Sequence, residues 1–150
     1  MKIRLPANRW GFSIIELLLT ISIIAILATS TTPVYTNFLA RNHLENKTNE
    51  VISSLQTAKT NSISGKEDSQ WGVNLSTQIV LFKGTSYVGR DTSFDQTYDI
   101  PASVSISPTQ EVIFNQLTGD PEAATTITIS NNQNESNTIT LNEIGTINVN

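Results

Sequence analysis

Hydrophobic residues are concentrated near the start of the chain. Between Phe12 and Ala28 most residues are apolar and only Glu16 is charged, and weakly polar residues continue the run to Thr36. A helix rises about 1.5 Å per residue, so roughly 20 such residues span the ~30 Å hydrocarbon core of a bilayer. The pattern therefore predicts an apolar helix that crosses a membrane once and leaves it near residue 36.

A different pattern follows the apolar run. Hydrophobic residues recur at spacings near three, four and seven, as in an amphipathic helix; they are Phe38, Leu44, Val51, Ile52, Leu55, Ala58 and Ile63. Pro33 precedes this pattern. Because proline lacks a backbone N–H and clashes with the carbonyl four residues earlier, we expect a helix kink there. Ser64 and Gly65 supply a stop signal. We therefore expect one helix over residues 12–64, whose later part packs against the rest of the chain.

Residues 65–150, which we call the head, contain short runs of alternating apolar and polar residues. Runs 71–75 and 79–82 are separated by three residues, a spacing typical of a hairpin. Two more flank Pro108, and the last three alternate Thr or Asn with Ile, Leu or Val, at 126–129, 138–141 and 146–149. Such alternation is typical of antiparallel strands with one buried face. The predicted fold class is α+β, with a long amino-terminal helix packed on a small antiparallel β-rich head.

Charge is distributed as unevenly as hydropathy. The formal net charge is −4, yet the first ten residues carry Lys2, Arg4 and Arg9 and no acid. The positive-inside rule places this end in the cytoplasm and the head outside. From residue 66 onward three bases stand against ten acids, a formal charge of −7. An acidic head disfavours nucleic acid as a partner. The chain has no cysteine, which excludes disulfides, thiolate catalysis and zinc–thiolate sites.

Glu16 is the residue that hydropathy alone does not explain. A carboxylate in a membrane helix costs about 2.5–3.5 kcal/mol on insertion scales, and the apolar run offers it no partner. A cleaved secretory signal has an apolar core of only ~7–15 residues, shorter than this run. A plain signal anchor fits the hydropathy but gives Glu16 no role. Glu16 is therefore a candidate functional residue.

The segment from Gly11 to Leu17 (GFSIIEL), placed after a basic leader, resembles the prepilin peptidase motif of type IV pilin-like proteins. The motif consists of Gly, then Phe, then Glu as the fifth residue counted from Phe, all before an apolar helix. Pro33 and Tyr35 also fall where type IV pilins commonly place a proline and a tyrosine. The first 36 residues therefore resemble a prepilin.

This resemblance assigns a role to each residue of the motif. It implies a leader at residues 1–11, which prepilin peptidase removes by cleaving between Gly11 and Phe12. Phe12 becomes the mature amino terminus and is N-methylated. Glu16 pairs with the Phe12 ammonium of a neighbouring subunit and sets the register of assembly. The implied partners are the peptidase, other pilin or pseudopilin subunits, and membrane lipid before assembly. The implied location is the cytoplasmic membrane as a single-pass protein, and then a filament.

The strand order of the head and its closing segment, residues 144–149, resemble the GspH/FimT-like minor pilins and pseudopilins. The resemblance implies a structural subunit of a type IV pilus, a type II secretion pseudopilus or a DNA-uptake pseudopilus. It implies no enzymatic activity and no cofactor. Two other functions stay open: a non-assembling, membrane-anchored extracytoplasmic binding protein, and a minor pilin that takes up DNA. The acidic head disfavours the second of these.

Two further features of the sequence are candidate sites. Asp91, Asp95 and Asp99 are evenly spaced, but a calcium loop needs closer oxygen ligands around a central Gly. We expect a solvated acidic loop before a strand. His43 is the only histidine and the chain has no cysteine, which argues against a metal site. His43 is also far in sequence from any candidate nucleophile, which disfavours a Ser–His–acid triad.

Overall fold

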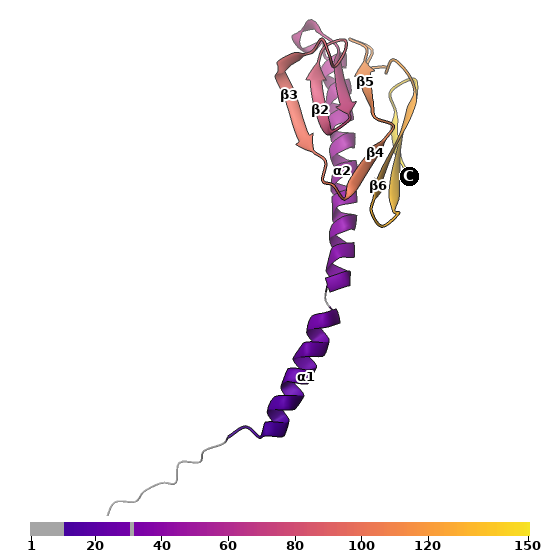
Figure 1. Ribbon diagram of the computed structural model, residues 1–150. Helices are drawn as coiled ribbons and strands as arrows, with labels where there is room; N and C mark the ends of the chain where they lie inside the picture. Colours follow the sequence, from indigo (N-terminus) through magenta and orange to yellow (C-terminus); the bar gives the residue numbers. More distant parts are fainter. Residues whose placement is uncertain (1–10, 31) are drawn as a thin grey trace, which may run out of the picture. The chain divides into compact units, whose positions relative to one another are not determined.

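The computed structural model describes residues 11–30 and 32–150, and Figure 1 shows the arrangement of its elements. The described helices and strands are α1 Ile14–Ser30, α2 Thr32–Ile63, the 3₁₀ helix η1 Lys66–Asp68, β1 Trp71–Leu75, β2 Gln78–Lys83, β3 Asp91–Asp99, β4 Val104–Ser107, β5 Gln110–Phe114, β6 Thr125–Asn131, β7 Ser136–Leu141 and β8 Ile147–Val149. The chain divides into two compact units after Thr36. We call residues 37–150 the larger unit and describe each unit by itself.

The helical part of the chain is assigned as two helices. α1 ends at Ser30 and α2 begins at Thr32, and residue 31 between them is not among the described residues. Pro33, where the sequence predicts a kink, is the second residue of α2. The predicted kink adjoins residue 31, which lies outside the described residues, and it stays a prediction.

α2 packs against the head along one stripe of its surface. The buried residues of the helix recur every three or four positions, mainly at Ala40, Leu44, Thr48, Val51, Leu55, Ala58 and Ser62. Phe38 and Ile63 were expected in this stripe, but their side chains are 61% and 45% exposed. Phe38 precedes Ala40 by two residues, which is about 200° around the helix, so it faces a different direction.

The head contains two four-stranded antiparallel sheets. The first sheet has the order β3-β2-β1-β5, and the second has the order β4-β6-β7-β8. The predicted hairpin is confirmed as β1 paired with β2, with Val73 opposite Leu81. The short connection that contains Pro108 joins β4 in the second sheet to β5 in the first. These elements confirm the α+β fold class and the antiparallel head.

One hydrophobic core is shared by α2 and the two sheets. It combines α2 residues with Trp71, Val73, Leu75, Ile79, Leu81, Val112 and Phe114 of the first sheet and Val104, Ile106, Ile127, Ile129, Ile139 and Leu141 of the second. In β6 and β7 the alternating Thr positions face away from this core, as the alternation predicts. Each fully buried side chain of this size contributes about 1.5–3 kcal/mol to folding.

Ser62 joins the end of α2 to both neighbouring segments of the first sheet. Its hydroxyl donates to the Phe114 carbonyl at 3.1 Å and accepts from the Trp71 N–H at 3.0 Å. Its own carbonyl accepts from the Leu117 N–H at 2.8 Å. Ser62, Trp71 and Phe114 are all buried, so the Trp71 N–H and the Phe114 carbonyl depend on this hydroxyl for a hydrogen bond.

Candidate functional site

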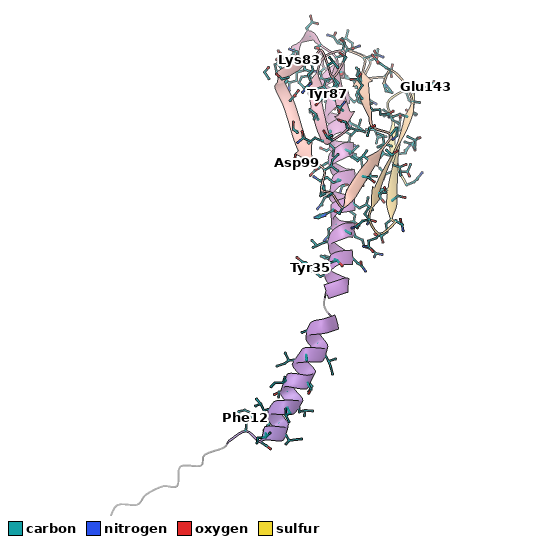
Figure 2. The ribbon with its side chains drawn as sticks, in the orientation of Figure 1. Phe12, Tyr35, Lys83, Tyr87, Asp99 and Glu143 are labelled. Carbon is teal, nitrogen blue, oxygen red and sulfur yellow. The ribbon has the colours of Figure 1, made fainter. Side chains whose placement is uncertain are left out.

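The motif residues lie where the chain enters α1. Gly11 and Phe12 precede the helix, and the Phe12 side chain is 85% exposed (Figure 2). The Ser13 carbonyl accepts backbone hydrogen bonds from Glu16 and Leu17 at 3.0 and 3.1 Å, which starts the helix. Residues 1–10, which contain the expected basic leader, lie outside the described residues.

Glu16 occupies the first turn of α1. A carboxylate there is favoured because the free N–H groups carry partial positive charge. Its side chain is exposed, and among the described residues it has no ion pair or side-chain hydrogen bond. The hydroxyls of Thr20 and Ser22 are different, because each donates to a carbonyl of its own helix, at 2.9 and 2.7 Å. Among the polar side chains of α1 that the structure describes, Glu16 is the one that its own helix leaves without a hydrogen bond.

The apolar side chains of α1 are exposed on every side of the helix. Exposure is near or above half for all the large ones, namely Ile14, Ile15, Leu17, Leu18, Leu19, Ile21, Ile23, Ile24, Ile26 and Leu27. These positions do not form a stripe, in contrast to α2. None of the described helices is both long enough and apolar enough to cross a membrane.

The expectation of an acidic loop at residues 90–99 is wrong. Asp91 to Asp99 form β3, the edge strand of the first sheet, with Tyr98 opposite Ile79. The strand was missed because its side chains are mostly polar and exposed and show no apolar alternation. Edge strands commonly carry charge, which discourages pairing with another chain. The three aspartates therefore lie along an edge and are not gathered around one point. Among the described residues, no three His, Asp or Glu side chains are placed to hold a metal ion.

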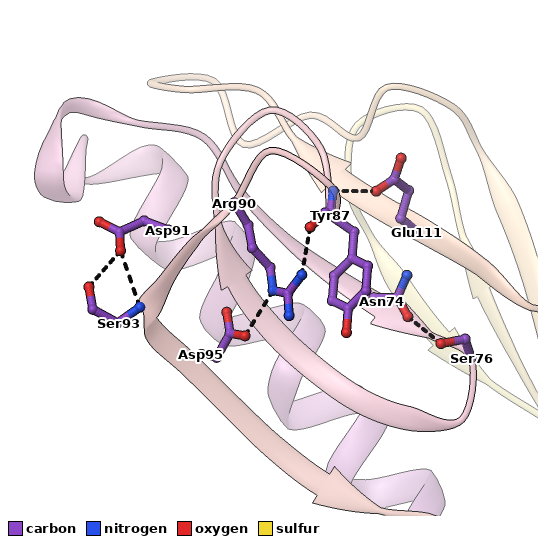
Figure 3. A network of polar contacts seen from close by, with 8 residues as sticks. All are labelled: Asn74, Ser76, Tyr87, Arg90, Asp91, Ser93, Asp95 and Glu111. Carbon is purple, nitrogen blue, oxygen red and sulfur yellow. Dashed lines mark hydrogen bonds and ion pairs between the residues drawn. The ribbon is translucent and has the colours of Figure 1, made fainter.

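The sequence did not predict a set of contacts that holds the loop 84–90 over the outer face of the first sheet, the face that points away from α2 (Figure 3). Arg90 Nε donates to Asp95 Oδ2 at 2.8 Å, and Arg90 Nη1 donates to the Tyr87 carbonyl at 2.8 Å. The Arg90 guanidinium also lies 3.8 Å from the centre of the Tyr87 ring. Tyr87 N–H donates to Glu111 Oε2 at 2.7 Å, which ties the loop to β5. The hydrogen bond to Asp95 raises the pKa of Arg90 above its usual value, so Arg90 stays charged.

This loop covers a second, smaller apolar cluster. Phe82 is fully buried on the outer face, with its ring 5.6 Å from that of Tyr87 in an edge-to-face arrangement. The Phe82 ring lies over Gly72, where an added Cβ would stand 2.6 Å from Phe82 Cζ and 2.9 Å from the Val112 carbonyl oxygen. The network is thus explained as support for packing, and nothing in it resembles a catalytic arrangement. Its contacts join residues up to 24 positions apart, so no local sequence signal predicted it.

His43 makes a structural contact. Its Nδ1 lies 2.9 Å from the Ser103 hydroxyl, which links α2 to the connection between β3 and β4. Of the predicted site residues, Gly11, Phe12 and Glu16 lie close together as neighbours along the chain, at the start of α1, whereas His43 and the three aspartates belong to the larger unit.

The chain matches no family model, no curated protein and no solved structure.

Proposed function

We propose that the chain is a type IV pilin-like structural subunit, either a minor pilin or a type II secretion pseudopilin. In this proposal prepilin peptidase cleaves the chain before Phe12, and the mature chain enters a filament through α1. The observation that carries the proposal is the exposed apolar surface of α1. An apolar helix exposed on all sides and carrying one unsatisfied carboxylate, Glu16, directly follows the Gly11–Phe12 pair.

The exposed surface of α1 supports packing against several neighbours at once. A helix that is apolar all round is stable only when its whole circumference is buried. Burial contributes about 25 cal/mol per Å² of apolar surface, and the large side chains from Ile14 to Leu27 all contribute to it. Packing within a bundle of identical or similar helices provides such burial on every side, whereas docking on one partner surface covers only one.

The carboxylate supports a defined register within that bundle. A buried Glu16 needs a cation, and cleavage before Phe12 creates an ammonium four residues away along the chain. The Phe12 ammonium of one subunit therefore pairs with Glu16 of the next when the helices are staggered by about one turn, or 5.4 Å. An unpaired charge in the same place would oppose assembly.

The structure of the larger unit supports different roles for the two helices. The apolar stripe of α2 is used within the chain, because Leu44, Val51 and Leu55 lie in the head core. α1 shares no residue with that core. The larger unit therefore has its own core, and the proposal assigns α1 to assembly.

The proposal includes a membrane stage before assembly. It rests on the sequence, in which the apolar and weakly polar run from Phe12 to Thr36 is longer than α1 and is preceded by Lys2, Arg4 and Arg9. The basic end stays in the cytoplasm and the head lies outside. Lipid then covers the apolar residues until neighbouring helices replace it.

Substitution of Glu16 tests the proposal. The full chain is co-expressed with prepilin peptidase and an assembly machinery that builds filaments from a known prepilin, and sheared filaments are analysed for the chain. Removing one partner of a buried ion pair costs about 3–5 kcal/mol, and each 1.4 kcal/mol is a factor of ten. We expect Glu16→Ala to be cleaved normally but to enter filaments at least about tenfold less than wild type.

Thr20→Ala is the matched control, because Thr20 lies one turn further along α1 and its hydroxyl is already bonded within the helix. It should enter filaments as wild type does. Incorporation of Glu16→Ala at the wild-type level would contradict the role of the ion pair. Absence of the wild-type chain from filaments, while the known prepilin assembles, would contradict the function and favour the non-assembling membrane-anchored binding protein.

A further inference from the structure

A groove of about 680 Å³ lies beside α2 in the larger unit. One wall is the flank of α2 from His43 to Ser53, and the other is formed by Tyr98, Asp99 and Pro101 at the end of β3. Figure 2 marks this end of β3 with Asp99. The volume falls within the range of about 300–1,000 Å³ that is usual for small-molecule sites.

The groove exists because the first sheet is wider than the helix that covers it. Tyr98 is paired with Ile79, so both side chains project from the same face of the sheet. Ile79 is fully buried in the core, whereas Tyr98 is 37% exposed. Four strands about 4.8 Å apart exceed the ~10 Å width of one helix, and the inner face of the edge strand remains open.

The charged groups of the groove are already paired. Lys47 Nζ lies 2.6 Å from Glu50 Oε2, and Asp99 Oδ1 accepts from Gln78 Nε2 at 2.5 Å. The groove therefore holds no free cation for an anionic ligand, and the head as a whole is acidic. The neutral polar side chains of the groove, unlike the charged ones, are not paired. The exposed side chains of Asn46, Asn49 and Ser53 have no hydrogen-bond partner among the described residues.

A peptide strand added to the edge of the sheet fits this region less well. β3 carries Asp91, Asp95 and Asp99 along its length, and charged edge strands discourage strand addition. The side chains of the groove that have no hydrogen-bond partner also belong to α2 and not to β3.

We propose that this groove binds a neutral carbohydrate, a short oligosaccharide without charged groups. Asn amides and a Ser hydroxyl both donate and accept hydrogen bonds, as sugar hydroxyls do. The Tyr98 ring supplies an apolar wall with a polar tip, which suits the C–H face of a sugar ring. The bound sugar replaces water on Asn46, Asn49 and Ser53 and leaves the Lys47–Glu50 pair intact. This binding goes beyond the structural role proposed above and does not depend on assembly.

The test uses the unassembled full chain in a detergent whose headgroup is not a sugar. It is applied to an array of neutral oligosaccharides built from hexoses and N-acetylhexosamines, and the strongest binder is titrated by calorimetry. We expect Tyr98→Ala and the double variant Asn46→Ala/Asn49→Ala each to raise Kd at least about tenfold. Tyr98→Phe keeps the ring and should raise Kd less than about threefold.

Two matched controls lie outside the groove. Tyr35→Ala removes another exposed tyrosine, and Gln56→Ala removes an exposed α2 side-chain amide beyond the groove. Both should bind as wild type does. Amide hydrogen exchange of β1 and β6 checks that every variant is folded, and the double variant changes only exposed residues.

Binding that the groove variants leave unchanged would overturn the proposal, as would the absence of any binder in the array. Hydrogen exchange of the groove on assembled filaments gives a further outcome. Protection of Asn46 and Asn49 by a neighbouring subunit, with no sugar bound by the free chain, would assign the groove to a protein contact instead. Since the sugar titration uses unassembled chain, its failure is distinct from a failure to enter filaments.

Discussion

α1 and α2 are built from similar apolar residues, yet they use them in opposite ways. Leu18 in α1 is 57% exposed, whereas Leu55 in α2 is fully buried against the sheets. The difference lies in spacing, because apolar residues surround α1 but form one stripe on α2. The stripe of α2 is buried within its own chain, and we propose that α1 finds its partners in other molecules.

The polar residues of the two regions differ in the same way. In the larger unit the buried Ser62 and Thr48 hydroxyls are each bonded to groups of the same chain. In α1 the Glu16 carboxylate has no partner among the described residues. These buried polar groups of the larger unit are therefore satisfied within the chain, whereas the proposal assigns the partner of Glu16 to another subunit.

The largest expected effect comes from comparing one large-to-alanine substitution in the buried core with one on the exposed surface of α1. Phe114 is fully buried in the core, so Phe114→Ala should lower the free energy of unfolding by about 3–5 kcal/mol. Leu18→Ala should change it by less than about 0.5 kcal/mol, because Leu18 is exposed and is not among the residues of the hydrophobic core. Hydrogen exchange of β1 and β6 in the full chain measures both. A large loss in Leu18→Ala would mean that α1 supports the head.

A second test concerns close packing on the outer face of the first sheet. Gly72→Ala places a methyl group against Phe82 and the Val112 carbonyl, and should destabilise the larger unit by about 1–3 kcal/mol. Gly89→Ala is the control, since an added Cβ there meets only the Ser86 hydroxyl at 3.2 Å. Equal effects of the two substitutions on urea unfolding would show that the cluster under loop 84–90 is loosely packed.

A third test removes the hydroxyl that joins α2 to the first sheet. Ser62→Ala leaves the Trp71 N–H and Phe114 carbonyl without this partner, at a cost of about 1–3 kcal/mol. Ser64→Ala removes an exposed hydroxyl bonded only to the nearby Asn61 carbonyl and should be close to neutral. Urea unfolding of both variants measures the difference. A neutral Ser62→Ala would indicate that water replaces the hydroxyl.

The smallest expected effect is a pH dependence at the turn between β6 and β7. Hydrogen bonding from Asn131, together with the Arg41 ion pair, lowers the pKa of Glu135 below its usual value of 4.5. A lowered folded-state pKa adds stability that is present above pH 4.5 and is lost as pH falls through the folded-state value. Between pH 6 and pH 3, Glu135→Gln should therefore lose slightly less stability than wild type.

Glu143→Gln is the control for this comparison, because Glu143 has no ion pair or side-chain hydrogen bond among the described residues. Thermal unfolding at several pH values provides the measurement. If Glu135→Gln followed the wild-type pH profile, the ion pair with Arg41 would contribute nothing to folding, as many exposed pairs do.

The sequence predicted the features that depend on local pattern. The apolar run of α1, the stripe of α2 from Leu44 to Ala58, and the Thr/Ile alternation of β6 and β7 all correspond to elements of the structure. The segment 91–99 was misread, because the side chains of this edge strand are mostly exposed on both faces, so no buried face imposes an apolar alternation. The groove beside Tyr98 was also not predictable, since it depends on the width of a sheet relative to a helix.

The residues discussed as candidate sites also fall into two groups, those that a local sequence motif identifies and those that only the structure brings together. Gly11, Phe12 and Glu16 form a short contiguous motif, so the sequence is sufficient to identify them. The loop network of Arg90, Tyr87 and Glu111 joins separate strands and was found only in the structure. The partners expected for α1 belong to other molecules.

The most direct test of the central claim is the intact mass of the chain after co-expression with prepilin peptidase, with an inactive peptidase as the control. We expect a peptidase-dependent loss of residues 1–11 and an added methyl group on Phe12. An uncut chain, under conditions that process a known prepilin, would contradict it and would leave an ordinary membrane-anchored protein.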